Sequence, residues 1–378
     1  MKNTPLTKPF FNRNEEKAVI EVLRSGWHTQ GPKVEEFENE IAKYTHSRYA
    51  IAVSSCTTAL HLALIIAGVG KNDEVLVPSF TFIASVNVIV QAGSTPVFIE
   101  IDEKTYNIDP RRLEEKITKK TKAIIIVDQV GLPCDFDSIK KIARKHNLFL
   151  IEDAACALGS FYKQKPVGGF SDITCFSFHP RKLISCGEGG IITTNIKRIA
   201  EQARILRSHG ASISDHLRHS AKKVSIETYT TAGFNYRLTD IQAAIGLEQL
   251  KKMSTILSKR NFLAKRYSKE LSKIKSIDIP FVPNYATPNW QSYIIKLSKN
   301  AKVSQKILMQ NLLKRGVATR RGVMACHLEP YYKKRFRNTF LPITERLTRN
   351  TISLPIFPQM TNIEQEYVIE TLLKYTKF

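Results

Sequence analysis

The sequence predicts an α/β protein whose central layer is a mostly parallel sheet of seven strands. Short apolar runs recur along the first half of the chain, and segments of helical or loop character separate most of them. This alternation is typical of parallel strands joined by crossover helices. The seven runs are residues 50–53, 74–77, 96–99, 122–127, 148–152, 173–178 and 190–194.

A different pattern follows residue 250 and predicts a smaller α+β domain. Polar residues 209–232 precede it and indicate a long loop. After an amphipathic helix we expect a strand, a helix ended by Gly316, an extended segment and a last helix, over residues 289–297, 304–315, 317–325 and 364–375. The predicted domains are residues 1–250 and 251–378.

The chain is strongly basic, because 57 Lys and Arg against 34 Asp and Glu give a net charge of +23. Such a charge attracts nucleic acid, an anionic membrane or a nucleotide diphosphate substrate. Residues 251–275 contain nine basic side chains and a single acidic one, Glu270. We interpret this stretch as the solvated face of the amphipathic helix, with contact to the inner membrane surface as the alternative.

The remaining composition is that of an ordinary globular protein, with 43% hydrophobic and 24% charged residues. None of its six cysteines forms a C-x-x-C pair, so we expect reduced thiols, a cytoplasmic location and no metal site. The N-terminus lacks the apolar segment of a signal peptide. Polar residues and a proline interrupt the most apolar stretch, residues 75–90, so we expect no stable membrane insertion.

Lys182 is the residue that most directly suggests a chemistry. An apolar run, residues 173–178, leads to it, and the glycine-rich sequence Gly-Glu-Gly-Gly of residues 187–190 follows. A lysine held between a strand and such a turn can form a Schiff base with an aldehyde cofactor. An ordinary surface lysine is the alternative, so the hypothesis depends on residues elsewhere in the chain.

Asp153 ends the apolar run 148–152, at the strand end where open α/β sheets gather their ligand chemistry. An aspartate there can pair with a protonated ring nitrogen, as pyridoxal phosphate (PLP) requires to accept electrons. A helix cap is the alternative role for such a residue.

Two further segments supply a phosphate site and an aromatic platform. Thr57 and Thr58 follow the run 50–53 and begin an Ala- and Leu-rich helix, whose free N–H groups attract anions. Phe82 follows the run 74–77 and can stack on a planar ring, although a core position is the alternative. Thr58, Phe82 and Asp153 each follow the end of an expected strand, so their side chains can meet at one edge of the sheet.

Along the chain the order is a phosphate site, an aromatic residue, an aspartate for the ring nitrogen and a lysine for the Schiff base. With this order, the chain resembles the DegT/DnrJ/EryC1/StrS family of PLP-dependent nucleotide-sugar aminotransferases, which have fold type I. The resemblance runs nearly end to end. Its lysine segment Phe-Ser-Phe-His-Pro-Arg-Lys and its Asn-Tyr-Arg segment are specific, and two other segments support them. These four segments are residues 176–182, 233–244, 25–32 and 354–358.

The resemblance implies a role for each cofactor residue. Lys182 is expected to bind PLP covalently and to shuttle a proton, Asp153 to pair with the pyridinium nitrogen, and Phe82 to stack on the ring. Cys156 stands where the family often has Gln or His near the ring oxygen, and a thiol is a weaker donor there.

The phosphate contacts implied by the resemblance come from two subunits. Thr57, Thr58 and Ser177 are expected to hold the phosphate, and Asn235 to reach the phosphate of the neighbouring subunit. A homodimer with shared active sites follows from that assignment.

Five residues are candidates for substrate contact. Arg320, with a second arginine beside it, and His327 lie in the extended segment and could meet a carboxylate or diphosphate, a solvated basic strand being the alternative. His179 belongs to the lysine segment. Trp27 and Thr29, in the N-terminal motif, are candidates for sugar-nucleotide contact, with packing as the alternative for Trp27.

The function implied is transfer of an amino group from glutamate to a keto group, expected at C4, of a nucleotide-linked 4-keto-6-deoxy sugar for surface polysaccharide or O-antigen. One alternative is a PLP- or PMP-dependent sugar dehydratase of the same fold, but relatives of that branch carry His where this chain has Lys182. A basic protein that binds nucleic acid or membrane is the other alternative.

Overall fold

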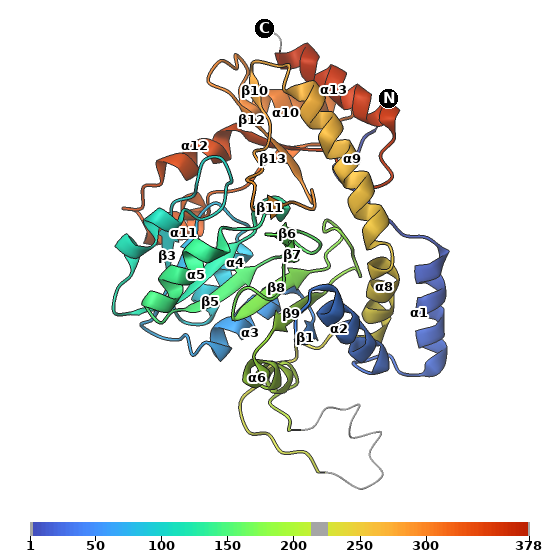
Figure 1. Cartoon of the computed structure of the whole chain (residues 1–378), viewed down its shortest axis with the longest axis vertical. Helices are drawn as coiled ribbons and strands as arrows, with labels where there is room; N and C mark the ends of the chain where they lie inside the picture. Colours follow the sequence, from blue (N-terminus) through green and yellow to red (C-terminus); the bar gives the residue numbers. More distant parts are fainter. Residues whose placement is uncertain (1–2, 213–225, 377–378) are drawn as a thin grey trace.

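The computed structural model describes residues 3–212 and 226–376 of the chain, and a mostly parallel sheet of seven strands lies at its centre. The strand order is β1-β9-β8-β5-β4-β2-β3, in which β9 is antiparallel to both of its neighbours. The predicted sheet is therefore confirmed (Figure 1). Its strands are β1 Tyr49–Val53, β2 Glu74–Pro78, β3 Thr95–Ile99, β4 Thr121–Val127, β5 Phe149–Asp153, β8 Ile173–Ser177 and β9 Gly190–Thr194.

Helices cover both faces of this sheet, because every central strand is apolar on its two sides. In β4, Ile125 packs into the cluster that includes α3, α4 and α6, whereas Ile124 and Ile126 pack with α5 on the opposite face. The helices of this part are α1 Arg13–Ser25, α2 Pro32–Tyr44, α3 Cys56–Ile66, α4 Ala84–Gln91, α5 Phe136–Lys145, α6 Lys197–Arg207 and α8 Asp240–Leu250.

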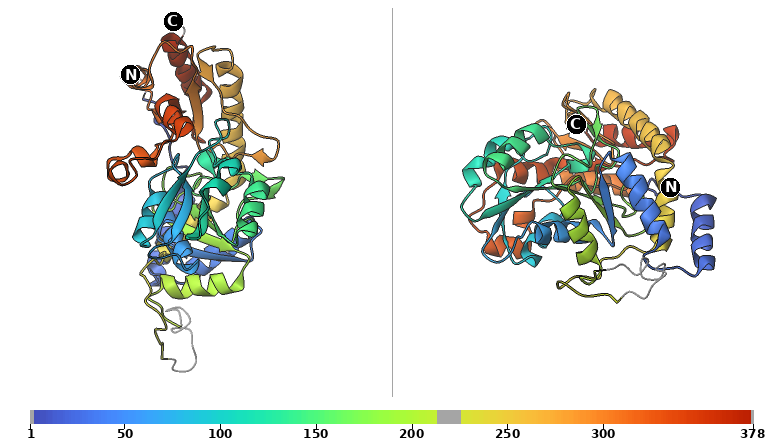
Figure 2. Two further views of the ribbon diagram at one scale, coloured as in Figure 1. Left: turned by 90° about the vertical axis from the view of Figure 1, so that its left-hand side faces the viewer. Right: turned by 60° about the horizontal axis from the view of Figure 1, so that its bottom comes forward.

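The C-terminal part has a sheet of four antiparallel strands in the order β10-β12-β14-β13. In the left view of Figure 2, most of this part, coloured orange and red, lies above the part that contains the larger sheet. The expected helix 304–315 corresponds to α10, and within the expected extended segment 317–325 a strand forms at β13. The bounds are β10 Ile277–Asp278, β12 Tyr293–Leu297, β13 Arg320–Arg321, β14 Thr351–Leu354, α9 Met253–Leu271, α10 Gln305–Lys314, α11 Pro330–Arg335, α12 Pro342–Asn350 and α13 Asn362–Thr376.

Contacts between the two parts position the active-site walls. A small three-stranded sheet joins β11 (Ala286–Thr287) to β6 (Phe161–Tyr162) and β7 (Lys165–Pro166), and Thr4 pairs with Val317. Short 3-10 turns complete the fold at Pro110–Arg112, Glu114–Lys116, Gln129–Gly131 and Cys326–Leu328. The boundary at residue 250 stays a proposal, supported by the end of α8 at Leu250.

The loop predicted over residues 209–232 is described at 209–212 and 226–232, and its middle, residues 213–225, lies outside the described residues. Within the described chain, no helix is both long and apolar enough to span a bilayer.

Candidate active site

Strand β8 and the turn after it hold Lys182 in place. The Phe178 N–H donates to the Gly189 carbonyl at 2.9 Å, which closes the base of the turn. A Cβ at Gly190 would collide with the backbone of Ser55 and Cys56, so glycine allows β9 to begin directly against the start of α3. The lysine turn and the N-terminus of α3 are therefore neighbours.

Lys182 as a whole residue is half-buried, and its Nζ donates to Cys156 Sγ at 3.2 Å. Burial acts to lower the pKa of Lys182, but the nearby Cys156 thiol and Asp153 carboxyl raise it above its ordinary value. Cys156 thus contacts the amine itself, a role that the resemblance to the family does not describe.

Asp153 lies at the carboxyl end of β5, and its side chain is 5% exposed. Its Oδ2 accepts a 2.7 Å hydrogen bond from Ser85 Oγ, and its Oδ1 accepts one from the Ala155 N–H at 3.2 Å. Burial raises the pKa of Asp153, while the Ser85 hydroxyl and the charge of Lys182 oppose that rise. Ser85 is a site residue that the sequence did not reveal, since only the packing of α4 brings it to β5.

A buried carboxyl pair lies directly behind Asp153. Glu152 Oε2 accepts from Thr174 Oγ1 at 2.6 Å, and Asp128 Oδ1 accepts from the Cys134 N–H at 2.9 Å. Burial raises the pKa of Glu152 well above its ordinary value and that of Asp128 to about 6. Among the described residues, the remaining oxygens, Glu152 Oε1 and Asp128 Oδ2, have no hydrogen-bond partner, and one proton shared between the two carboxyls would satisfy both.

The N-terminus of α3 forms another wall. Ser55 caps it and accepts from the Thr58 N–H at 3.1 Å, while the Thr58 hydroxyl donates back to the Ser55 carbonyl at 2.8 Å. Ser55 and Thr57 line the cavity together with Ser177, but Thr58 does not line it. The structure therefore gives Thr58 a capping role and leaves Ser55, which was not predicted, facing the anion position.

One cavity of about 680 Å³ joins these groups. Phe82, whose side chain is 66% exposed, lines it together with Asp153 and Lys182. Gln129 also lines it, and its side chain donates to the Phe80 carbonyl, fixing the segment that carries Phe82. Phe82 therefore does not pack in the core, which was the alternative position considered for it.

The C-terminal part closes the cavity from the other side. Arg320 and Arg321 line it, and Arg321 pairs with Glu329 at 2.9 Å. His179 also lines it and lies 4.0 Å from Glu188.

The structure gives His327 a different position from the one expected. It is 2% exposed and does not line the cavity. Its Nδ1 shares a 2.7 Å hydrogen bond with Ser79 Oγ, and its Nε2 lies 3.4 Å from Glu345 Oε1. Both ring nitrogens are thus engaged in the core, so a substrate contact by His327 is corrected to a packing role.

Trp27, Thr29 and Asn235 lie outside the cavity of their own chain. Trp27 is half-buried beside Gly31, and both Thr29 and Asn235 are exposed. Asp240 joins the two motifs, because its carboxylate accepts from the Gly31 N–H at 2.8 Å and its own N–H donates to the Thr29 carbonyl at 3.0 Å. Sequence reasoning missed Asp240 because its partners lie some two hundred residues away.

These residues suit an aldehyde cofactor with a phosphate and a cationic ring. A buried carboxylate, an accessible aromatic face, an amine and a capped helix N-terminus with serine hydroxyls all border one cavity. The fold and the site thus define a fold type I PLP enzyme.

Comparison with known proteins identifies the family. Residues 10–373 match the model of the DegT/DnrJ/EryC1/StrS aminotransferase family, and the chain belongs to that family. It is therefore a PLP-dependent aminotransferase.

Three relatives illustrate the similarity. The spore coat polysaccharide biosynthesis protein SpsC of Bacillus subtilis is 36% identical over 377 residues, which cover 99% of this chain and 97% of SpsC. Helicobacter pylori PseC, an aminotransferase involved in the biosynthesis of pseudoaminic acid, superposes with a TM-score of 0.92 at 29% identity, covering 100% of both chains. The PLP form of the putative sugar aminotransferase Spr1654 from Streptococcus pneumoniae has a TM-score of 0.92 at 30% identity, covering 100% of this chain and 99% of that one.

Proposed function

We propose that this aminotransferase moves the amino group of glutamate to the C4 keto group of a nucleotide-linked 4-keto-6-deoxy sugar, for a surface polysaccharide such as O-antigen. The observation that carries the proposal is that one cavity exposes both the Lys182 and Asp153 pair and the cationic Arg320. A guanidinium there suits a carboxylate or a diphosphate. The names of SpsC and PseC, which concern polysaccharide and pseudoaminic acid biosynthesis, support a sugar as the acceptor.

We assign the roles of the cofactor residues as follows. When bound, PLP supplies an aldehyde for covalent attachment and a ring that withdraws electrons from the reacting carbon. Lys182 Nζ would hold the cofactor and, once released, would move a proton from the Cα of glutamate to the cofactor carbon. Asp153 would keep the ring nitrogen protonated, and Phe82 would stack on the ring. Ser55, Thr57 and Ser177 bind the phosphate.

The same steps in reverse complete the reaction. The Lys182 amine would move a proton from the cofactor carbon to the sugar carbon that receives nitrogen, so in each half of the reaction one group would serve as base and then as acid. Arg320 is placed to bind the anionic group of each substrate in turn. A single cavity that opens to both parts of the chain allows glutamate and the sugar nucleotide to alternate at the same amine.

We further propose a homodimer that acts in the cytoplasm. Asn235 is exposed and does not line the cavity of its own chain, which is what a contact supplied to a partner's phosphate requires. Asp240 ties the Asn235 segment to the N-terminal motif, so Trp27 and Thr29 would accompany Asn235 to the partner's site. All six cysteines are free thiols, as suits a reducing compartment.

The test is a transamination assay with purified enzyme, glutamate and a panel of keto sugar nucleotides. We expect 2-oxoglutarate and amino sugar in equal amounts, with the 4-keto-6-deoxy substrates turned over fastest. Lys182→Ala should abolish turnover, whereas Lys165→Ala, at an exposed lysine of β7, should not. Dehydration of the sugar without consumption of glutamate would contradict the proposal and favour the dehydratase alternative.

A further inference from the structure

Part of the basic charge of residues 251–275 is neutralised in the fold. Four of the nine cations of this stretch form ion pairs, and Arg260 is buried against two backbone carbonyls. Acids from this and other elements therefore offset four of the nine positive charges, and the four lysines that stay unpaired are spread over seventeen residues, from Lys259 to Lys275. The pairs are Lys251–Glu248, Lys252–Glu15, Arg266–Glu366 and Lys273–Glu270.

A denser group of unpaired positive charges lies on α11 and the loop that follows it. Four exposed cations lie within five residues, and no acidic side chain of the described chain forms an ion pair with them. The two flanking acids, Glu329 and Glu345, are engaged with Arg321 at 2.9 Å and Arg349 at 3.1 Å. We call this group the 333–337 cation cluster; it consists of Lys333, Lys334, Arg335 and Arg337.

Two exposed aromatic side chains border the 333–337 cation cluster. Phe340 is 74% exposed and Tyr331 is 51% exposed. The Arg335 guanidinium lies 3.9 Å from the centre of the Tyr331 ring and covers one face of it, whereas no cation of the described residues lies over Phe340 in this way. The surface therefore combines several free cations with one bare apolar ring.

This combination favours a lipid surface over a nucleic acid. Single-stranded nucleic acid is bound by several aromatic rings that stack successive bases, and this surface offers one bare ring. An anionic bilayer, in contrast, attracts clustered Lys and Arg and accepts a single aromatic side chain at the level of its headgroups.

We propose that the 333–337 cation cluster and Phe340 bind the enzyme reversibly to anionic phospholipid bilayers. Each cation near such a surface strengthens binding about fivefold, so four of them strengthen it by roughly two to three orders of magnitude. The attraction is electrostatic and must weaken as salt shortens the Debye length. If the proposed function holds, binding here would keep an enzyme of polysaccharide biosynthesis at a membrane, although no helix of the described residues can span one.

The experiment is co-sedimentation of the PLP-loaded enzyme with vesicles of phosphatidylcholine alone or mixed with phosphatidylglycerol. We expect binding to the mixed vesicles alone, at low salt. A variant with Lys333, Lys334, Arg335 and Arg337 each changed to Gln should lose at least a hundredfold in partitioning. Phe340→Ser should weaken binding several-fold without changing its salt dependence.

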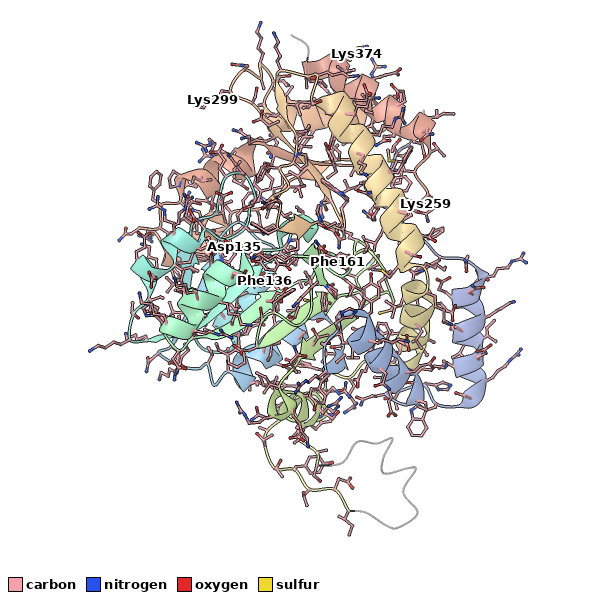
Figure 3. The ribbon with its side chains drawn as sticks, in the orientation of Figure 1. Asp135, Phe136, Phe161, Lys259, Lys299 and Lys374 are labelled. Atoms are coloured by element: carbon pink, nitrogen blue, oxygen red, sulfur yellow. The ribbon has the colours of Figure 1, made fainter. Side chains whose placement is uncertain are left out.

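A matched control separates this surface from the total charge of the chain. Lys259, Lys265, Lys269 and Lys275 are exposed cations of α9 and the segment after it, and Figure 3 shows Lys259 on the outer side of α9. Changing these four to Gln removes the same charge and should lower partitioning far less. Equal losses in the two variants would overturn the proposal, as would wild-type enzyme that ignores mixed vesicles. A change of oligomeric mass in the 333–337 variant would also overturn it, by showing that the surface joins subunits.

Discussion

Replacing Ser85 with Ala tests whether the environment of Asp153 governs cofactor binding. The Ser85 hydroxyl donates at 2.7 Å to Asp153 Oδ2, and both side chains are buried. A hydrogen bond to a charged group contributes about 1.5–3 kcal/mol. Its loss destabilises the ionised carboxylate that must pair with the cofactor nitrogen, which corresponds to PLP binding weakened about ten- to a hundredfold.

The assay is a PLP titration followed by absorbance at several pH values. Because the Ser85 hydroxyl lowers the pKa of Asp153, its removal raises that pKa, and the pH below which PLP binding fails should move upward. Ser160→Ala is the matched control, since the Ser160 hydroxyl is equally buried and donates at 2.7 Å to the Gly131 carbonyl instead. Unchanged PLP affinity and an unmoved pH limit in Ser85→Ala would refute the reasoning.

Three other predictions follow from the same structure. Burial raises the pKa of Glu152 above its unfolded value, so its stabilising effect is full below about pH 4, the unfolded pKa of Glu, and is lost as pH rises through the folded pKa. Glu152→Gln should flatten this decline of the thermal unfolding temperature with rising pH. An unfolding temperature that depends on pH as in the wild type would exclude a shared proton. Gly190→Ala should destabilise the fold by about 2 kcal/mol or more through its clash with Ser55, as measured by urea unfolding, and a stable variant would contradict the close approach. Cys156→Ala should lower the pKa of Lys182, so that the rate of PLP attachment rises at lower pH than in wild type; an unshifted pH–rate curve would count against the contact.

The sequence was sufficient for the sheet and for the residues that follow its strand ends. Asp153, Phe82 and Lys182 all come to the cavity because parallel strands β5, β2 and β8 end at one edge. The period of the apolar runs and the order of the motifs contain that information.

Residues brought in by packing could not be predicted in this way. Ser85 reaches Asp153 only through the orientation of α4, and Asp240 binds the backbone of Gly31, 209 residues away. His327 has the residue type of a ligand, but hydrogen-bonding partners from other segments of the chain, Ser79 and Glu345, hold it in the core.

The distribution of unpaired charge could not be predicted from the sequence either. Residues 251–275 look like a basic surface when only their own sequence is read, yet Glu15 and Glu366, remote in the chain, neutralise two of their cations. A net charge can be counted from composition, but where it remains free depends on tertiary pairing.

The most direct test of the account is to find which lysine holds PLP. The PLP-loaded enzyme is reduced with borohydride, digested and mapped by mass spectrometry, with and without prior addition of glutamate. We predict the cofactor mass on Lys182 alone, and its loss when glutamate is added first. A label on another lysine, or a label on Lys182 that glutamate does not remove, would contradict the account.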